Sequence, residues 1–137
     1  MSKKAFVTKE MIEEIVKTYP TPFHIYDEKG IRENARKLKE AFSWNPGYKE
    51  FFAVKATPNP YLIDILREYG CGTDCSSMTE LMLSKAMGVK GEDIMFSSND
   101  TPAEEFVYAA KIGATINLDD LTHIAFLEKT LGYYRKH

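Results

Sequence analysis

A repeated unit in the second part of the chain constrains the fold most. Helical patterns follow four apolar, strand-forming runs, which are spaced by 21, 22 and 21 residues and begin near Phe51, Gly72, Ile94 and Thr115. Short strands that alternate with single helices form a parallel sheet with right-handed crossovers. The repeat therefore predicts four βα units, which we assign to residues 48–137.

Residues that begin and end helices mark the boundaries of these units. The predicted helix starts are Asn59 with Pro60, Ser77 with Glu80, Thr101 with Pro102 and Glu104, and Asp119 or Asp120. The residue that follows a helix is often a glycine in the left-handed conformation. Four glycines stand at such positions: Gly70, Gly88, Gly113 and Gly132.

Two α/β architectures fit such a repeat, a doubly wound sheet and a (β/α)8 barrel. No Gly-x-Gly-x-x-Gly pattern follows the first strand, which argues against a dinucleotide-binding sheet. A closed barrel typically needs roughly 250 residues, so four units supply only about half of one. We therefore expect an α/β fold that is about half of a TIM-like barrel, in a piece of a longer protein or in an assembly.

The first 47 residues predict a helix-strand-helix lead-in. The first helix follows Thr8, ends at Pro20 and carries on one face Met11, Ile12, Ile15, Val16 and Tyr19. A short strand is expected over residues 23–26. Asp27 then caps a second helix, whose expected buried stripe is Ile31, Ala35, Leu38 and Phe42.

Polar residues stand where the predicted strands end. Lys55 ends the first strand, Asp74 the second, residues 97–100 the third and residues 117–120 the fourth. All should face one rim, because loops at the carboxyl ends of such strands build the site. A lysine held against an apolar strand favours the free amine, which can form a Schiff base with a carbonyl group. Asp74 could hold a proton or steady that amine. Spacing alone equally allows Lys55 to reach solvent and Asp74 to begin a loop.

Composition limits the partners. The formal net charge is −2, with 28% charged residues and no basic block, which argues against nucleic-acid binding. No run is apolar and long enough for a membrane span or a signal-peptide core, so we expect a cytoplasmic protein. Cys71 and Cys75 lack a second Cys or His pair at zinc spacing, and we expect reduced thiols and no metal.

Three stretches together carry a family resemblance. The segments are "TPFHIYD", "FFAVKA" and "GCGTDCSSMTEL", in this order. They resemble the N-terminal portion of the fold-type III pyridoxal-phosphate decarboxylases, the group of diaminopimelate and ornithine decarboxylases, from about residue 21 to residue 131. The first stretch is most similar to the diaminopimelate enzymes, and the last is closer to the ornithine enzymes. Met78 and Thr79 replace the Gly-Gly usual in the former.

The resemblance implies a barrel of the alanine racemase and decarboxylase type that uses pyridoxal 5'-phosphate. Lys55 matches the lysine that holds the cofactor and later returns a proton to carbon. Asp74 matches the aspartate beside it, and Glu80 matches a cofactor-binding glutamate, although Glu80 is equally suited to a capping box with Ser77. The expected reaction is decarboxylation of a basic or dicarboxylic amino acid, with meso-diaminopimelate converted to L-lysine as the first choice, in a homodimer.

The resemblance also implies groups beyond the fourth strand, among them the phosphate loop and the partner of the pyridine nitrogen. We therefore expect the 137-residue chain alone to bind pyridoxal phosphate weakly or not at all and to have little or no activity. Three alternatives stay open: an ornithine- or arginine-type decarboxylase, a racemase-like or cofactor-carrying barrel, and a non-catalytic interaction module that pairs through its open edges.

Overall fold

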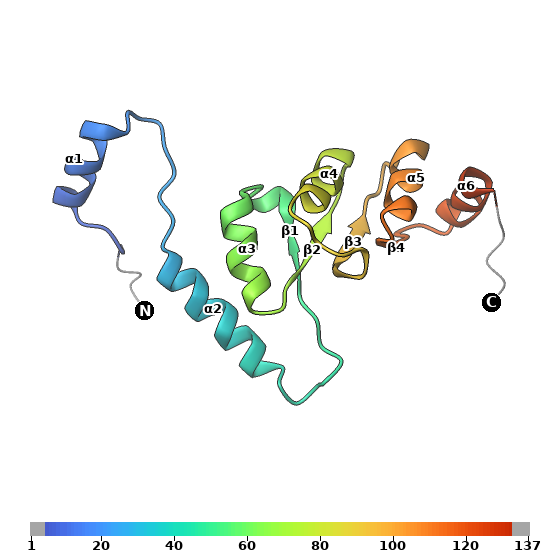
Figure 1. Ribbon diagram of the computed structural model, residues 1–137, viewed down its shortest axis with the longest axis horizontal. Helices are drawn as coiled ribbons and strands as arrows, with labels where there is room; N and C mark the ends of the chain where they lie inside the picture. The colour runs from blue at the N-terminus through green and yellow to red at the C-terminus, as the bar shows by residue number, and fades with distance from the viewer. Residues whose placement is uncertain (1–4, 133–137) are drawn as a thin grey trace.

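A computed structural model describes residues 5–132 and contains one parallel sheet (Figure 1). The strands lie in chain order, β1-β2-β3-β4, and every neighbouring pair is parallel. Their bounds are β1 Phe51–Ala53, β2 Gly72–Cys75, β3 Ile94–Ser97 and β4 Thr115–Asn117. The four units and the half-barrel expected from the repeat are confirmed.

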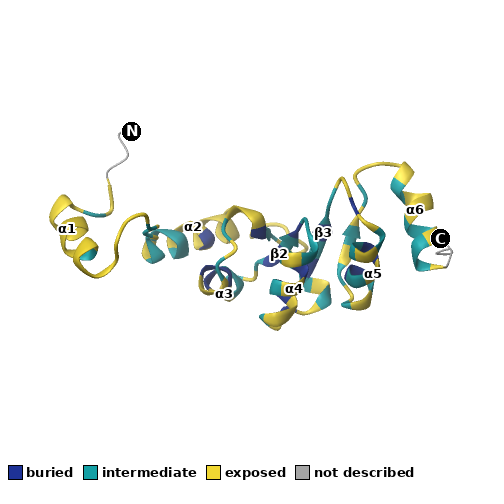
Figure 2. Cartoon of the chain, turned by 90° about the horizontal axis from the view of Figure 1, so that it is seen from above, coloured by how far each residue is buried: buried dark blue, intermediate teal, exposed yellow. Residues whose placement is uncertain are grey.

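Each strand is followed by a helix, and the first three of these helices return the chain to the start of the next strand. These helices are α3 Pro60–Glu68, α4 Met78–Ala86, α5 Ala103–Lys111 and α6 Thr122–Leu131, with short 3-10 turns η1 Val54–Ala56 and η2 Gly91–Asp93. Helices α3, α4 and α5 lie on one side of the strands (Figure 2). The hydrophobic core lies between these helices and the sheet and contains Val54, Ile63, Cys75, Leu81, Val89, Ile94, Phe96, Phe106 and Ala109.

The other face of the sheet is not covered by the described residues. Along β3, Ile94 and Phe96 are buried, whereas Met95 and Ser97 are half-buried. The register places Ala53, Asp74, Met95 and Thr115 in one row across the sheet. Thr115 at the end of this row is exposed. Because parallel sheets are normally buried on both faces, this face is the one that a closed barrel would enclose.

The lead-in forms two helices, α1 Lys9–Thr18 and α2 Glu28–Ala41. The predicted caps are confirmed: Thr8 accepts a hydrogen bond from the Met11 N–H at 3.3 Å, and Asp27 accepts one from the Gly30 N–H at 3.0 Å. Helix α1 has no buried residue and stands apart from the sheet (Figure 1), so its predicted apolar face is exposed except for the half-buried Ile15.

The strand predicted over residues 23–26 is wrong, because this segment has no strand assignment. Its apolar residues suit a strand, but a strand needs a neighbour, and the sheet of residues 5–132 pairs only β1 to β4. The predicted buried stripe of α2 is also only partly correct. Ala35 is buried, but Leu38 and Phe42 are exposed, and the Phe42 ring stacks on Tyr48 instead.

The predicted helix ends are confirmed, because all four glycines have positive φ, between 71° and 92°. Two predicted starts are shifted. Pro102, not Thr101, is the N-cap of α5, and the Thr101 hydroxyl donates to the Ser98 carbonyl. Helix α6 begins at Thr122, although the Asp120 carboxylate still accepts its N–H at 2.7 Å. The proposed division between residues 47 and 48 stays a prediction.

Candidate functional site at the carboxyl ends of the strands

Lys55 lies just beyond β1, in the turn η1, rather than at the end of the strand as predicted. The strand stops because the backbone tightens here: the Thr57 N–H donates to the Val54 carbonyl at 3.1 Å. Val54 is fully buried in the core and anchors the turn, whereas Lys55 is exposed. Among the described residues Lys55 thus reaches solvent, one of the two alternatives left open by the sequence, and its reaction with a carbonyl group stays a prediction. Within residues 5–132, no hydrogen bond or ion pair engages the Lys55 ammonium group.

Asp74 lies in β2, on the uncovered face of the sheet, level with Ala53 of β1. It is half-buried, and its Oδ1 accepts a hydrogen bond from the Ser97 hydroxyl of β3 at 2.5 Å. The alternative in which Asp74 merely begins a loop is wrong, because the residue is inside the strand. The structure thus brings Lys55 and Asp74 to the carboxyl ends of adjacent strands, without a direct contact between them.

Glu80 has a local role at the start of α4. Its Oε2 accepts from the Ser76 N–H at 2.8 Å, and its Oε1 accepts from the Ser77 hydroxyl at 3.0 Å. Both oxygens therefore satisfy polar groups at the helix start, close to the predicted capping box but with Ser76 in place of Ser77 as the backbone donor. Within residues 5–132, Glu80 forms no hydrogen bond or ion pair with Lys55 or Asp74.

The sequence predicts that residues 97–100 end the third strand and does not single out Ser97. In the structure it is the last residue of β3 and pairs in register with Asn117, the last residue of β4. The signal that could have found it was spacing, because Ser97 lies two positions after Met95 and so shares the face of Asp74. The sequence cannot show the rotamer that joins Ser97 to Asp74.

Side chains of the loop between β4 and α6 make contacts at the start of α6. Asp120 binds the hydroxyl and N–H of Thr122, and these hydrogen bonds lower the pKa of its carboxyl group. The His123 ring packs edge-on against Phe106, and its Nδ1 lies 3.3 Å from an oxygen of Asp119. The His123 ring is therefore packed against α5.

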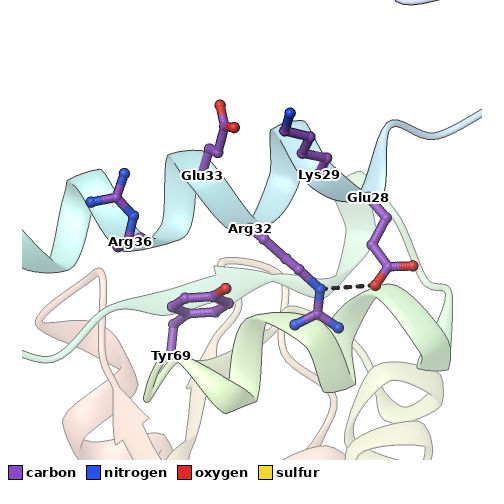
Figure 3. A pocket seen from close by; sticks show the side chains of 6 residues that line it. All are labelled: Glu28, Lys29, Arg32, Glu33, Arg36 and Tyr69. Carbon is purple, nitrogen blue, oxygen red and sulfur yellow. Dashed lines mark hydrogen bonds and ion pairs between the residues drawn. The ribbon is translucent and has the colours of Figure 1, made fainter.

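Two clefts of the described residues are not lined by Lys55, Asp74 or Ser97. One of about 350 Å³ lies along α2 (Figure 3) and is lined by Glu28, Lys29, Arg32, Glu33 and Arg36 of this helix and by Tyr69, the residue after α3. Arg32 is paired with Glu28 and Glu68, and these carboxylates raise the pKa of its guanidinium group. Because Arg32 is already neutralised, this cleft is a poor anion site.

A larger groove of about 560 Å³ runs along the open edge of the sheet. It is lined mainly by apolar side chains of α5, β4 and α6, among them Ile116, Leu118, Ile124 and Leu127. Its position beside β4 marks where a further strand and helix would continue a barrel. None of the helices in residues 5–132 combines the length and the apolar character that crossing a membrane requires.

The chain was compared with known proteins. Residues 28–134 match the family described as pyridoxal-dependent decarboxylase, pyridoxal binding domain. Protein TabA of Pseudomonas amygdali pv. tabaci is 44% identical over 110 residues, which are 80% of this chain and 26% of TabA. The diaminopimelate decarboxylase of Thermoplasma acidophilum is 33% identical over 111 residues, which are 81% of this chain and 27% of that enzyme.

A solved structure supports the same assignment. The crystal structure of diaminopimelate decarboxylase from Helicobacter pylori complexed with L-lysine superimposes with a TM-score of 0.78 at 28% identity, and the match covers 88% of this chain and 31% of that one. The chain thus spans between about a quarter and a third of the length of these relatives. Because the family match covers most of the chain and the fold agrees, the chain belongs to the pyridoxal-dependent decarboxylases, through their pyridoxal-binding domain.

Proposed function

We propose that this chain supplies the lysine-bearing part of a pyridoxal-phosphate site that decarboxylates a basic or dicarboxylic amino acid. The observation that carries the proposal is the position of Lys55, exposed two residues after the end of β1 and at the same end of the sheet as Asp74 of the neighbouring strand. A primary amine without an intramolecular partner among residues 5–132 is free to react with an aldehyde. The Lys55 amine is therefore suited to the aldehyde group of the cofactor.

Three residues have proposed roles toward the cofactor. Lys55 would hold it through Nζ and, once a substrate amine has taken its place, would carry a proton to the substrate carbon. Asp74 would accept a hydrogen bond from an N–H group on the uncovered face. The acceptor would be Oδ2, because Ser97 already donates to Oδ1. Glu80 would act through the start of α4. When bound, pyridoxal phosphate supplies an electron sink for the electrons left as carbon dioxide departs.

The proposed substrate is meso-diaminopimelate, with L-lysine as the product. The support is likeness: the Thermoplasma acidophilum relative is a diaminopimelate decarboxylase, and the Helicobacter pylori enzyme was solved with L-lysine. An ornithine-type substrate is the second choice, since the ornithine decarboxylase of Nicotiana glutinosa is 29% identical over 99 residues. The proposal includes a cytoplasmic location, which two free thiols, Cys71 and Cys75, support.

We further propose that turnover requires residues that this chain does not contribute. The described residues place an amine and a carboxylate on the rim, but Lys55 and Asp74 line neither the cleft along α2 nor the groove beside β4. The uncovered sheet face and the apolar groove beside β4 support pairing with more protein, including the proposed homodimer. Analytical ultracentrifugation of the chain distinguishes a dimer from a monomer or an aggregate.

The test is an absorbance titration with pyridoxal phosphate, followed by borohydride reduction and peptide mapping. We expect an absorbance change that Lys55→Ala abolishes and a reduced pyridoxyl group on Lys55. Lys90→Ala is the matched control, because Lys90 is exposed just ahead of β3, at the opposite end of the strands. Labelling that is equal in wild type and Lys55→Ala would refute the proposed role of Lys55. Mass spectrometry with meso-diaminopimelate should show no L-lysine from the chain alone.

A further inference from the structure

We infer that Ser97 is a positioning residue, which fixes the carboxylate of Asp74 for the amine end of the bound cofactor. This inference rests on the proposed function. Asp74 and Ser97 come from adjacent central strands and are separated by 23 positions in the sequence. Their contact is the one side-chain hydrogen bond on the uncovered face that joins two strands within residues 5–132.

The register explains why these two side chains meet. Asp74 lies level with Met95, and Ser97 lies two residues further along β3 on the same face. Ser97 is therefore two residues nearer the carboxyl end of the sheet than Asp74, and its hydroxyl donates to the Asp74 carboxylate. Met95, the direct neighbour of Asp74, has no N–H or O–H in its side chain and cannot take this role.

The contact leaves half of the carboxylate available. The Ser97 hydroxyl donates to Oδ1, and within the described chain Oδ2 has no hydrogen-bond partner. A donor on one oxygen restricts rotation of the carboxylate, so the second oxygen keeps one direction at little further entropic cost. Because Lys55 lies two residues after Ala53, which is level with Asp74, the Asp74 carboxylate and the Lys55 amine belong to the same end of the sheet.

The binding experiment compares pyridoxal-phosphate affinity among four proteins: wild type, Ser97→Ala, Ser97→Thr and the control Ser43→Ala. We expect Ser97→Ala to weaken binding about tenfold, the effect of one lost hydrogen bond to a charged group. Ser97→Thr keeps the hydroxyl and should restore binding to within about twofold of wild type. Ser43 is exposed in the turn after α2, and its removal should change nothing.

A double-variant comparison separates positioning from general stability. If Ser97 acts through Asp74, Ser97→Ala should have no further effect on affinity in an Asp74→Asn background, because the two effects share one interaction. Additive effects would overturn the inference. Thermal unfolding without cofactor monitors folding. If Ser97→Ala does not fold, Ser97→Cys takes its place, since a thiol fills similar space but is a weak donor.

The outcomes also separate this inference from the function on which it depends. Wild-type labelling at Lys55 together with unchanged affinity in Ser97→Ala overturns only the role of Ser97. Wild-type protein that carries no label at Lys55 overturns both.

Discussion

Arg32 on α2 and Glu68 on α3 form a two-point ion pair. Nη1 of Arg32 donates to Oε2 of Glu68, and Nη2 donates to Oε1 at 3.3 Å. Bidentate geometry of this kind fixes orientation better than a single contact. The pair therefore attaches the lead-in helix α2 to the first helix of the barrel units.

Arg32→Ala should lower the melting temperature slightly, because the pair is largely exposed and such pairs contribute little. The difference should depend on pH. Arg32 lowers the pKa of the Glu68 carboxyl group below its usual value of 4.5, so the stabilisation is present above pH 4.5 and is lost as the pH falls through the lower folded value. Thermal unfolding from pH 7 to pH 3 measures this. The control Arg36→Ala breaks a pair within α2 only, and an equal loss in both variants would contradict the prediction.

Gly91→Ala should destabilise the fold by about 1–3 kcal/mol, the usual cost of overpacking. A Cβ atom at Gly91 would lie 2.3 Å from the Ile112 carbonyl oxygen and 2.7 Å from backbone atoms of Gly113. Backbone atoms cannot move aside as the end of a flexible side chain can. Urea unfolding measures the loss. Gly47→Ala, where the nearest atom is 3.5 Å away, should be nearly neutral.

Phe96→Ala should cost about 3–5 kcal/mol of unfolding free energy, because a fully buried aromatic ring leaves a cavity. Phe96 is 0% exposed and packs edge-on against Phe106, 6.1 Å between ring centres. Chemical denaturation measures the change. Phe6→Ala, which removes a ring that is 52% exposed, is the control, and a similar loss in both variants would argue against the described core.

Cys71 should react more slowly with iodoacetamide at pH 8 than a free thiol in a peptide. Burial, and next the charge of Glu50, raise the pKa of the Cys71 thiol above its ordinary value of 9.0, so less thiolate is present at this pH. Cys75 is fully buried and should stay unmodified until urea unfolds the chain. Mass spectrometry of alkylated peptides gives both rates, and rapid modification of Cys75 in native protein would contradict its place in the core.

Glu80→Ala should lower stability by about 1 kcal/mol even without cofactor, because the Ser76 N–H and the Ser77 hydroxyl lose their acceptor. Glu80→Gln keeps one acceptor oxygen and should lose less. The comparison addresses the two roles expected for Glu80. A Gln variant of unchanged stability whose cofactor affinity falls would assign it to the cofactor, and parallel losses in both measurements would assign it to the helix start.

The regular part of the fold was predictable because it depends on local signals. The spacing of apolar runs located all four strands, and glycines such as Gly70 and Gly113 located the helix ends. The strand expected over residues 23–26 failed for a different reason. Its residues favour an extended chain, but strand formation is a property of two segments, and one segment does not reveal its neighbour.

The candidate site was predictable by position and less so by contacts. The place of Lys55 followed from the end of an apolar run, yet its exposure depends on how the η1 turn directs the chain. The contact between Ser97 and Asp74 depends on strand register and on rotamers, which are set by packing between residues that are 23 positions apart in the sequence. The predicted capping interactions of Glu80 are close to the observed ones, because they are confined to one helical turn.

The identity between strand order and chain order has a consequence for how this sheet is assembled. Each strand pairs with the one made just before it, so every new βα unit finds its docking surface already formed. Contacts between units that are close in sequence favour rapid folding. The sheet can therefore grow stepwise as the polypeptide leaves the ribosome, with Lys55 and Asp74 brought to one rim as soon as the second strand is in place.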